Sequence, residues 1–295
     1  MSGFFRGHKR RGSYDLFSSY NHFLPGWGGL LVLGLLFALG TMIGGYFLRW
    51  LESFSQTFAD EYGLLLCYPI TFFPAMIYAS TMSRLNEHRI CSTPVDNNPE
   101  GWKNTLLLAL GCSVATIATA YITEPITEFL PEMPQEWKDA MDRILHNMPF
   151  WATLVSVSIF APLFEELLCR GFILRGLLQK TSPAIAICIS ALFFALIHGN
   201  PWQAIPAFIL GLLFGEVYYR TRSLKLTMLM HCANNTVAAC LSKVPEFKEA
   251  NTFMDVLSPW AYWSIFAACI LILASALVIL RNAQQHQDCP AYRHL

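Results

Sequence analysis

The sequence predicts an all-α membrane protein, a polytopic bundle of about eight transmembrane helices with its functional core in spans four to seven. Two observations predict this fold. First, 54% of the 295 residues are hydrophobic and 14% are charged, whereas a soluble domain is typically about 25% charged. Second, the charged residues fall in short clusters between long apolar stretches, which is the pattern of a chain that crosses a bilayer several times.

Seven or eight stretches of the sequence are long and apolar enough to be spans. A crossing helix needs about 20 predominantly apolar residues, because its backbone polar groups must be hydrogen-bonded within the segment. The fifth and seventh stretches are short and contain polar residues, which are costly in a membrane bundle and usually functional, so we count them. The predicted spans are residues 28–48, 62–79, 104–122, 150–168, 183–198, 202–219, 226–241 and 259–280.

The basic residues predict that both termini lie in the cytoplasm, because Lys and Arg concentrate in cytoplasmic loops. With eight spans and a cytoplasmic N-terminus, 15 of the 20 basic residues fall on the cytoplasmic side, all except Arg49, Lys138, Arg143, Lys243 and Lys248. We therefore expect a basic cytoplasmic arm at residues 1–27, one transmembrane domain at 28–281 and a cytoplasmic tail at 282–295. The basic arm and the length are typical of a bacterial inner-membrane protein.

The loop between the third and fourth spans is acidic. It is compatible with an amphipathic helix at the membrane interface around Trp137, Ile144 and Leu145, or with a solvated loop. Its six acidic residues are Glu124, Glu128, Glu132, Glu136, Asp139 and Asp142.

Two adjacent glutamates, Glu165 and Glu166, lie near the end of the fourth span. Two carboxylates at membrane depth cannot both stay charged and unpaired without a large energetic cost. Arg170 follows Glu166 by four residues, so these two share a helix face and can form an ion pair. Glu165 has no partner nearby in the sequence, and we interpret it as a general base. Two interfacial glutamates that face water are the alternative.

Polar residues also mark the fifth and seventh spans. His198 ends the fifth span four residues after Phe194, and His231 and Asn235 lie four residues apart on the seventh. An imidazole and an amide on one helix face supply two hydrogen-bond donors, which is what a tetrahedral oxyanion needs. Interfacial contacts or helix–helix hydrogen bonds are the structural alternative for each residue. Together with Glu165, they predict a site with a base, a second base or orienting group, and two donors.

The sixth span contains features that we interpret as structural. Gly211 and Gly215 form a GxxxG face that allows another helix to approach closely. Glu216 can pair with Arg220 four residues later.

Missing motifs narrow the chemistry. The sequence contains no HExxH, no GxSxG, no GxxxxGK[ST], no CxxC pair and no Asp inside a predicted span. These absences argue against a zincin-like metalloprotease, a serine hydrolase, an ATP-driven transporter, a cysteine-ligated metal site and an aspartate-pair intramembrane protease. Acidic and basic residues number 20 each, so the net charge gives no indication of a nucleic-acid partner.

At these residues the sequence resembles the family of CAAX proteases and bacteriocin-processing enzymes, also called the Abi family. Glu165, Glu166 and Arg170 are similar to its EExxxR motif. Phe194 with His198 is similar to FxxxH, and His231 with Asn235 is similar to HxxxN. The three motifs occur in order on successive spans. The resemblance covers residues 149–237, within a family-like core at 149–242, and the remaining spans match only as apolar helices.

The resemblance implies an intramembrane endopeptidase that uses no metal and no cofactor. Glu165 would activate water with the help of His198, and His231 and Asn235 would form the oxyanion hole. Glu166, Arg170 and Phe194 would support the site. The implied partners are a peptide or protein substrate, with or without a lipid modification, and membrane lipid, but no nucleic acid. Because prokaryotic members of the family have varied substrates, cleavage of prenylated CAAX proteins is not carried over.

Two alternatives stay open. One is the same enzyme with a zinc ion held by a carboxylate and two imidazoles. The other is a non-enzymatic immunity protein, scaffold or small-solute transporter.

A simple eight-span arrangement places Glu165 and His231 toward the cytoplasm and His198 toward the opposite side. Convergence therefore requires irregular helices, which we expect near Pro162 or Pro183. A separation of His198 and Glu165 beyond about 10 Å, with no alternative conformer, would contradict the catalytic assignment.

Overall fold

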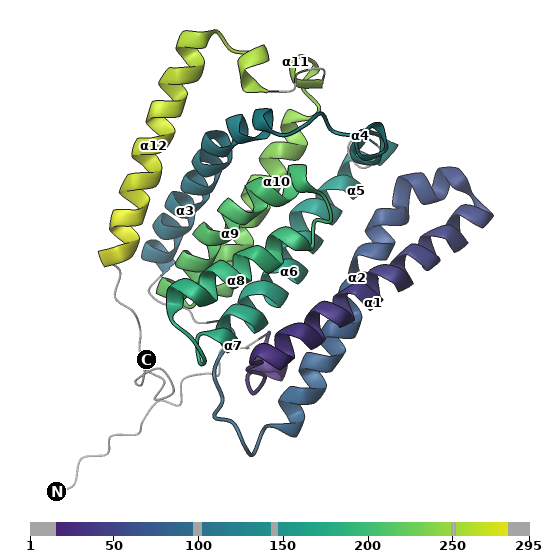
Figure 1. Cartoon of the computed structure of the whole chain (residues 1–295), viewed down its shortest axis with the longest axis vertical. Coiled ribbons are helices and arrows are strands. Elements are labelled where there is room, and N and C mark those ends of the chain that lie inside the picture. Colours follow the sequence, from purple (N-terminus) through teal and green to yellow (C-terminus); the bar gives the residue numbers. More distant parts are fainter. Residues whose placement is uncertain (1–15, 97–101, 143–146, 249, 251, 283–295) are drawn as a thin grey trace, which may run out of the picture.

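The structure is a computed structural model that describes residues 16–96, 102–142, 147–248, 250 and 252–282. Within these residues the regular structure is helical and contains no strand (Figure 1). The predicted all-α class is therefore confirmed. The predicted N-terminal arm lies outside the described part of the chain up to residue 15, as does the tail from residue 283 onward.

Each predicted span corresponds to a helix or to a run of short helical segments. The fourth is a run of five, in which α6 is flanked by two π-helical segments, η4 and η5. The remaining described helices are short and lie in connecting loops. The long helices are α1 (Trp27–Phe54), α2 (Gln56–Leu85), α3 (Trp102–Thr123), α8 (Pro183–Leu196), α9 (Pro201–Thr221), α10 (Leu224–Leu241) and α12 (Pro259–Asn282). The fourth span consists of α5 (Phe150–Leu154), η4 (Val155–Phe160), α6 (Ala161–Glu166), η5 (Leu167–Leu174) and α7 (Arg175–Leu177). The short helices are η1 (Ser18–Tyr20), η2 (Glu124–Phe129), α4 (Gln135–Asp142), α11 (Pro245–Lys248) and η6 (Phe253–Asp255).

Five helices in the described part of the chain are long and apolar enough to cross a membrane. This agrees with an integral membrane protein. A sixth helix, α8, is apolar but shorter. The helices α9 and α10, which carry polar residues, are not among these. A total of eight crossings therefore remains a prediction. The five are Trp27–Phe54, Gln56–Leu85, Leu106–Ile126, Phe150–Leu177 and Pro259–Arg281.

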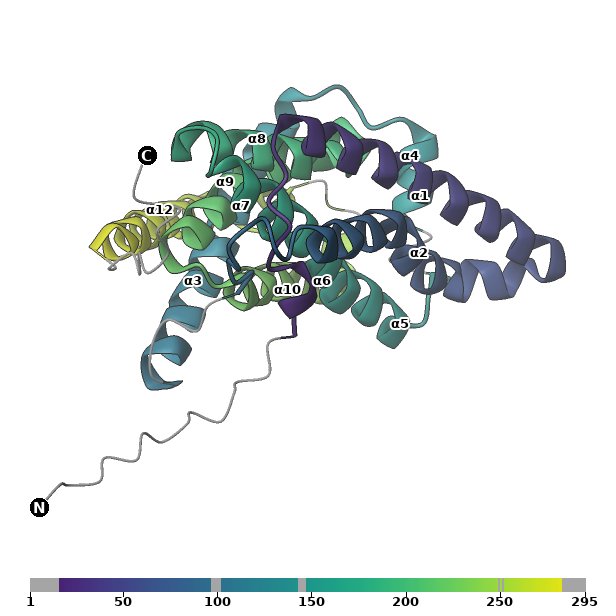
Figure 2. The same ribbon diagram turned by 90° about the horizontal axis from the view of Figure 1, so that it is seen from below.

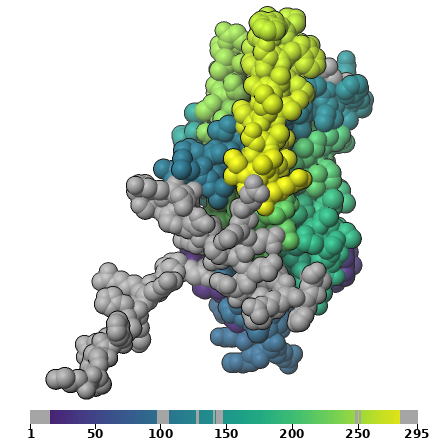
Figure 3. Space-filling view, turned by 90° about the vertical axis from the view of Figure 1, so that its left-hand side faces the viewer, coloured from purple at the N-terminus to yellow at the C-terminus, as the bar shows by residue number. Residues whose placement is uncertain are grey.

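The helices form a bundle with the fourth span, α8, α9 and α10 in the middle (Figure 1). The α1–α2 hairpin packs along one side, and α12 lies at the opposite edge against α3 (Figures 1 and 2). In the space-filling view, α12 forms a ridge along one face of the molecule (Figure 3). The short helices α4 and α11 lie at the end of the bundle opposite α7 (Figure 1).

Glycines set the closest helix contacts. A Cβ atom at Gly40 of α1 would lie 2.0 Å from the backbone oxygen of Thr71 on α2. At Gly211 and Gly215 of α9, a Cβ would lie 3.0 and 2.9 Å from side-chain or backbone atoms of α8. The predicted packing role of the GxxxG face is therefore confirmed, and it brings α8 and α9 close together.

The fourth span is longer than the sequence predicted. We expected it to end at residue 168, with Arg170 and Arg175 in a cytoplasmic loop, but the helix continues to Leu177 and both arginines are buried. The physical reason is that each guanidinium has partners inside the protein. Arg175 donates hydrogen bonds to the carbonyl oxygens of Thr93, Tyr20 and Phe23 at 2.7–2.8 Å, and thereby ties the segment before α1 to α7.

The predicted irregularity occurs at Pro162. This residue lies in the first turn of α6, and π-helical segments precede and follow that helix. Proline has no backbone N–H, so it removes one regular helical hydrogen bond, and π-helical turns are frequent at functional sites. Pro183, the other position considered, simply begins α8.

Candidate active site

A buried ion pair forms the centre of the polar cluster. Nη1 of Arg170 lies 2.8 Å from Oε1 of Glu166, and both side chains have no solvent exposure. Nη2 of Arg170 donates to the carbonyl oxygen of Gly211 at 2.9 Å. The guanidinium also lies over the rings of Phe194 and Phe214, 4.5 and 5.2 Å from their centres. The pairing predicted from the four-residue spacing is present, and it links the fourth span to α8 and α9.

His231 lies between the two glutamates. Its Nδ1 atom is 3.1 Å from Oε1 of Glu166, and its Nε2 atom is 4.0 Å from Oε2 of Glu165. Because Glu166 accepts from Arg170 as a carboxylate, it can only accept from the imidazole as well, so Nδ1 carries the proton of that contact. This leaves Nε2 directed toward Glu165.

The two oxygens of Glu165 have different surroundings. Oε1 accepts a hydrogen bond from the hydroxyl of Tyr68 on α2. Oε2 has no hydrogen-bond partner among the described residues and faces His231. Tyr68 was not predicted as a site residue, because it lies 97 residues from Glu165 in the sequence. Tyr68 is one of three tyrosines in its predicted span, residues 62–79, so nothing in the sequence distinguished it.

Phe194 connects the two histidines. Its ring centre lies 5.1 Å from that of His198 and 5.4 Å from that of His231, nearly edge-on in both cases. His198 follows α8 and donates from Nδ1 to the carbonyl oxygen of Phe194 at 2.7 Å. Among the described residues, His198 and Glu165 share no hydrogen bond or ion pair. Their connection runs through Phe194 and His231.

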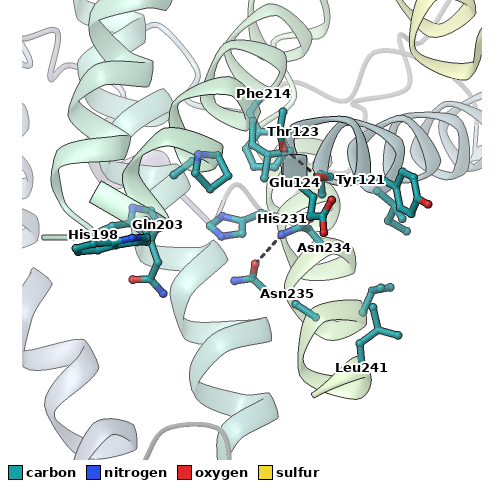
Figure 4. Close-up of a pocket in the computed structure, with 18 of the residues that line it drawn as sticks. Tyr121, Thr123, Glu124, His198, Gln203, Phe214, His231, Asn234, Asn235 and Leu241 are labelled. Carbon is teal, nitrogen blue, oxygen red and sulfur yellow. Dashed lines mark hydrogen bonds between the residues drawn. The ribbon is translucent and has the colours of Figure 1, made fainter. Parts of the chain in front are cut away.

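Asn235 lies one turn after His231 on α10. Its Nδ2 donates to the carbonyl oxygen of Val157 in π-helical η4 at 2.7 Å. Asn234 donates to Oδ1 of Asn235 at 3.1 Å, the dashed contact in Figure 4. These two bonds orient the Asn235 amide. Asn234 was not singled out from the sequence, where the Asn-Asn pair is its only signal.

A cavity of about 450 Å³ adjoins this cluster. The cavity is lined by His198 just after α8, by Gln203 on α9, and by His231 and Asn235 on α10 (Figure 4). Most of the remaining wall is apolar and comes from α3, α9 and α10. The cavity therefore combines an apolar wall with the imidazoles and amide predicted from the sequence.

The opposite wall of the cavity contains Glu124 (Figure 4). This carboxylate accepts from the backbone N–H of Phe253 at 2.6 Å and from the hydroxyl of Tyr262 at 3.0 Å. It thereby joins the end of α3 to η6 and α12. In the part of the chain that the structure describes, no group of three His, Cys, Asp or Glu side chains could hold a metal ion.

The segment that carries this cluster is also the part of the chain that is similar to a known protein family. Residues 147–237 match the sequence model of the Rce1-like family, described as type II CAAX prenyl endopeptidase Rce1-like. This confirms the resemblance found in the sequence for that segment. No solved structure matches the chain.

Three curated bacterial proteins are similar to this chain. The UPF0177 protein YxdF of Lactococcus lactis is 28% identical over 43% of this chain and 71% of its own length. The UPF0177 protein YaiF of the same organism is 28% identical over 46% of this chain and 63% of its own length. The protein named "Putative membrane peptidase YdiL" of Bacillus subtilis is 26% identical over 31% of this chain and 38% of its own length. The similarity therefore spans part of each protein.

Proposed function

We propose, from the match of residues 147–237 to the Rce1-like family, that this chain is an intramembrane endopeptidase of the glutamate type. One observation supports the proposal above the others. The ring of His231 lies between two buried carboxylates, Glu165 and Glu166, and the same ring lines a largely apolar cavity whose wall includes neither carboxylate. A base and a hydrogen-bond donor thus face each other where water is largely excluded, and electrostatic interactions are strong in such a site.

The attacking water would bind between Glu165 and His231. Oε2 of Glu165 and Nε2 of His231 are 4.0 Å apart, too far for a direct hydrogen bond but suitable for a water about 2.8 Å from each atom. The Glu165 carboxylate would take a proton from this water as the water oxygen attacks the peptide carbonyl carbon. The proton would then pass to the leaving amine, so that the products are a carboxylic acid and an amine.

His231 and Asn235 would stabilise the oxyanion. Nδ1 donates to Glu166 and fixes the orientation of the ring, so Nε2 would donate to the oxyanion only from the doubly protonated imidazolium, whose charge the two neighbouring carboxylates would offset. Asn235 uses its amide group toward Val157, and because an amide group has two N–H donors, one stays available for a substrate oxygen. Removal of a single donor from an oxyanion hole typically costs about 100- to 1,000-fold in kcat.

His198 would assist the water or the leaving group. Because its Nδ1 donates to the Phe194 carbonyl, Nε2 of the neutral ring is left as an acceptor. His198 also lines the cavity together with His231. In this proposal the reaction uses side chains of the protein alone, without a metal ion or cofactor.

The substrate would be a peptide or protein segment at the membrane, with or without a lipid modification. The largely apolar wall of the cavity suits an apolar segment or chain. We propose that the protein resides in a bacterial inner membrane with eight crossings and both termini in the cytoplasm, as its basic residues predict.

The test is a comparison of protein termini in cells that express the wild type, Glu165→Gln or Glu216→Gln at matched levels in the membrane. Glu216 is the matched control, because it pairs with Arg220 at 2.8 Å outside the cluster. We expect new termini with the wild type and Glu216→Gln, and none with Glu165→Gln. If no terminus depends on Glu165, the peptidase proposal is wrong, and an immunity protein, scaffold or transporter becomes the better interpretation.

A further inference from the structure

Tyr68 is the one hydrogen-bond donor from the described residues to the Glu165 carboxylate. It belongs to α2, outside the segment at residues 147–237 that matches the family. The bond therefore joins the N-terminal helical hairpin to the carboxylate on which the proposed reaction depends.

Aromatic packing fixes the Tyr68 ring relative to the helix that carries Glu165. The rings of Tyr68 and Phe72 are stacked, with centres 5.5 Å apart. Phe72 in turn stacks on Phe164, also at 5.5 Å and with 16° between the planes. Since Phe164 precedes Glu165 in the chain, the stack holds the phenol in register with the carboxylate.

The hydrogen bond distinguishes two oxygens that are otherwise equivalent. The terminal torsion of a glutamate is broad and nearly two-fold, so a carboxylate without a partner rotates and exchanges its oxygens. Because Oε1 accepts a hydrogen bond from Tyr68, Oε2 faces Nε2 of His231. Oε2 accepts no hydrogen bond from the described part of the chain.

We propose that Tyr68 is a positioning residue for the Glu165 carboxylate. Its hydroxyl holds Oε1, so that Oε2 is presented to the water and to His231. The inference rests on the proposed function for its catalytic consequence, but the hydrogen bond itself can be tested without any substrate.

The first experiment measures steady-state cleavage by full-length Tyr68→Phe. The probe is a synthetic peptide that spans a junction identified by the comparison of termini. We expect kcat to fall about 10- to 100-fold, the usual cost of poorly held catalytic geometry, with KM within about two-fold of the wild type. The matched control is Tyr62→Phe, the same change on the same helix, because Tyr62 contacts Trp151 instead of a carboxylate. An unchanged kcat in Tyr68→Phe overturns the proposal.

The second experiment uses the protein alone. The infrared C–O stretching band of a tyrosine shifts when its phenol loses a hydrogen-bond acceptor. Since the chain has 11 tyrosines, the band of Tyr68 is isolated as the difference between proteins with and without Tyr68→Phe. We expect this band to shift when the same difference is recorded in a Glu165→Ala background.

The two experiments separate the two possible failures. If the band stays unchanged without the Glu165 carboxylate, Tyr68 does not bind it and the positioning role is wrong, whatever the enzyme does. If the band shifts but no junction depends on Glu165, the hydrogen bond stands and the peptidase proposal fails.

Discussion

The Nδ1 atom of His231 lies 3.1 Å from Oε1 of Glu166, the same oxygen that accepts a hydrogen bond from Arg170. One carboxylate oxygen therefore serves a guanidinium from its own helix and an imidazole from α10. This shared contact couples the stability of the buried ion pair to the orientation of the imidazole.

Removal of one member of the ion pair should destabilise the protein more than removal of both. Arg170→Met leaves the Glu166 carboxylate buried without its counter-charge, and the loss of one partner of a buried pair typically costs about 3–5 kcal/mol. The double variant Glu166→Leu/Arg170→Met leaves no buried charge at this position and should recover part of that loss. Thermal unfolding of the purified proteins in one detergent measures the difference. A double variant less stable than the single one would contradict this account.

Substitution of His231 should strongly slow the cleavage of a Glu165-dependent junction. His231→Ala removes a proposed oxyanion donor, and we expect kcat to fall about 100- to 1,000-fold. The control is His22→Ala, because His22 donates from Nδ1 to the carbonyl oxygen of Ile90 and does not line the cavity. Wild-type cleavage by His231→Ala would exclude the proposed role.

A chelator should leave cleavage unchanged. In the proposed reaction the water is activated by Glu165 and the oxyanion is stabilised by side chains, so prolonged dialysis against a strong chelator should not alter kcat/KM. Metal analysis of the active preparation is the accompanying measurement. Loss of activity on dialysis, with recovery on addition of zinc, would favour the zinc-dependent alternative instead.

Arg175 should be required for the segment before α1 to stay packed. Its three hydrogen bonds reach the carbonyls of Thr93, Tyr20 and Phe23. A hydrogen bond to a charged group typically contributes about 1.5–3 kcal/mol, so Arg175→Met, which removes all three, should lower the unfolding temperature and expose this segment to protease. Arg220→Met is the control, because the Arg220–Glu216 pair is partly exposed and such pairs contribute about 1 kcal/mol or less. Equal protease resistance in the two variants would refute the role of Arg175.

Much of the candidate site could be predicted because its residues come in pairs four positions apart. Glu166–Arg170, Phe194–His198 and His231–Asn235 each place two side chains on one helix face before any tertiary structure is known. The structure shows the first pair as an ion pair and the second as a hydrogen bond from the His198 side chain to the backbone carbonyl of Phe194. The all-α class was equally accessible, since it follows from the apolar stretches.

Contacts between distant segments could not be predicted in this way. The Tyr68–Glu165 hydrogen bond depends on how the α1–α2 hairpin packs against the fourth span, and the bond from Asn235 to Val157 depends on a π-helical turn. The predicted end of the fourth span was too early. An arginine such as Arg170 is expected outside a membrane span unless it has buried partners, and those partners are visible only in the structure. In each case a polar group gains its partner only from tertiary packing.

The contact between α1 and α2 yields a test that is independent of catalysis. Gly40→Ala would place a Cβ 2.0 Å from the backbone oxygen of Thr71, so the helices must separate, and we expect a loss of about 1–3 kcal/mol. Gly45→Ala, five residues along the same helix, meets no atom within 4 Å and should be neutral or stabilising by up to about 1 kcal/mol. Because Tyr68 lies on α2, the Gly40 variant should also lower kcat if the hairpin positions Glu165. Thermal unfolding and peptide cleavage on the same preparations provide the comparison, and a Gly40→Ala protein as stable as Gly45→Ala would show that the helices are not packed this closely.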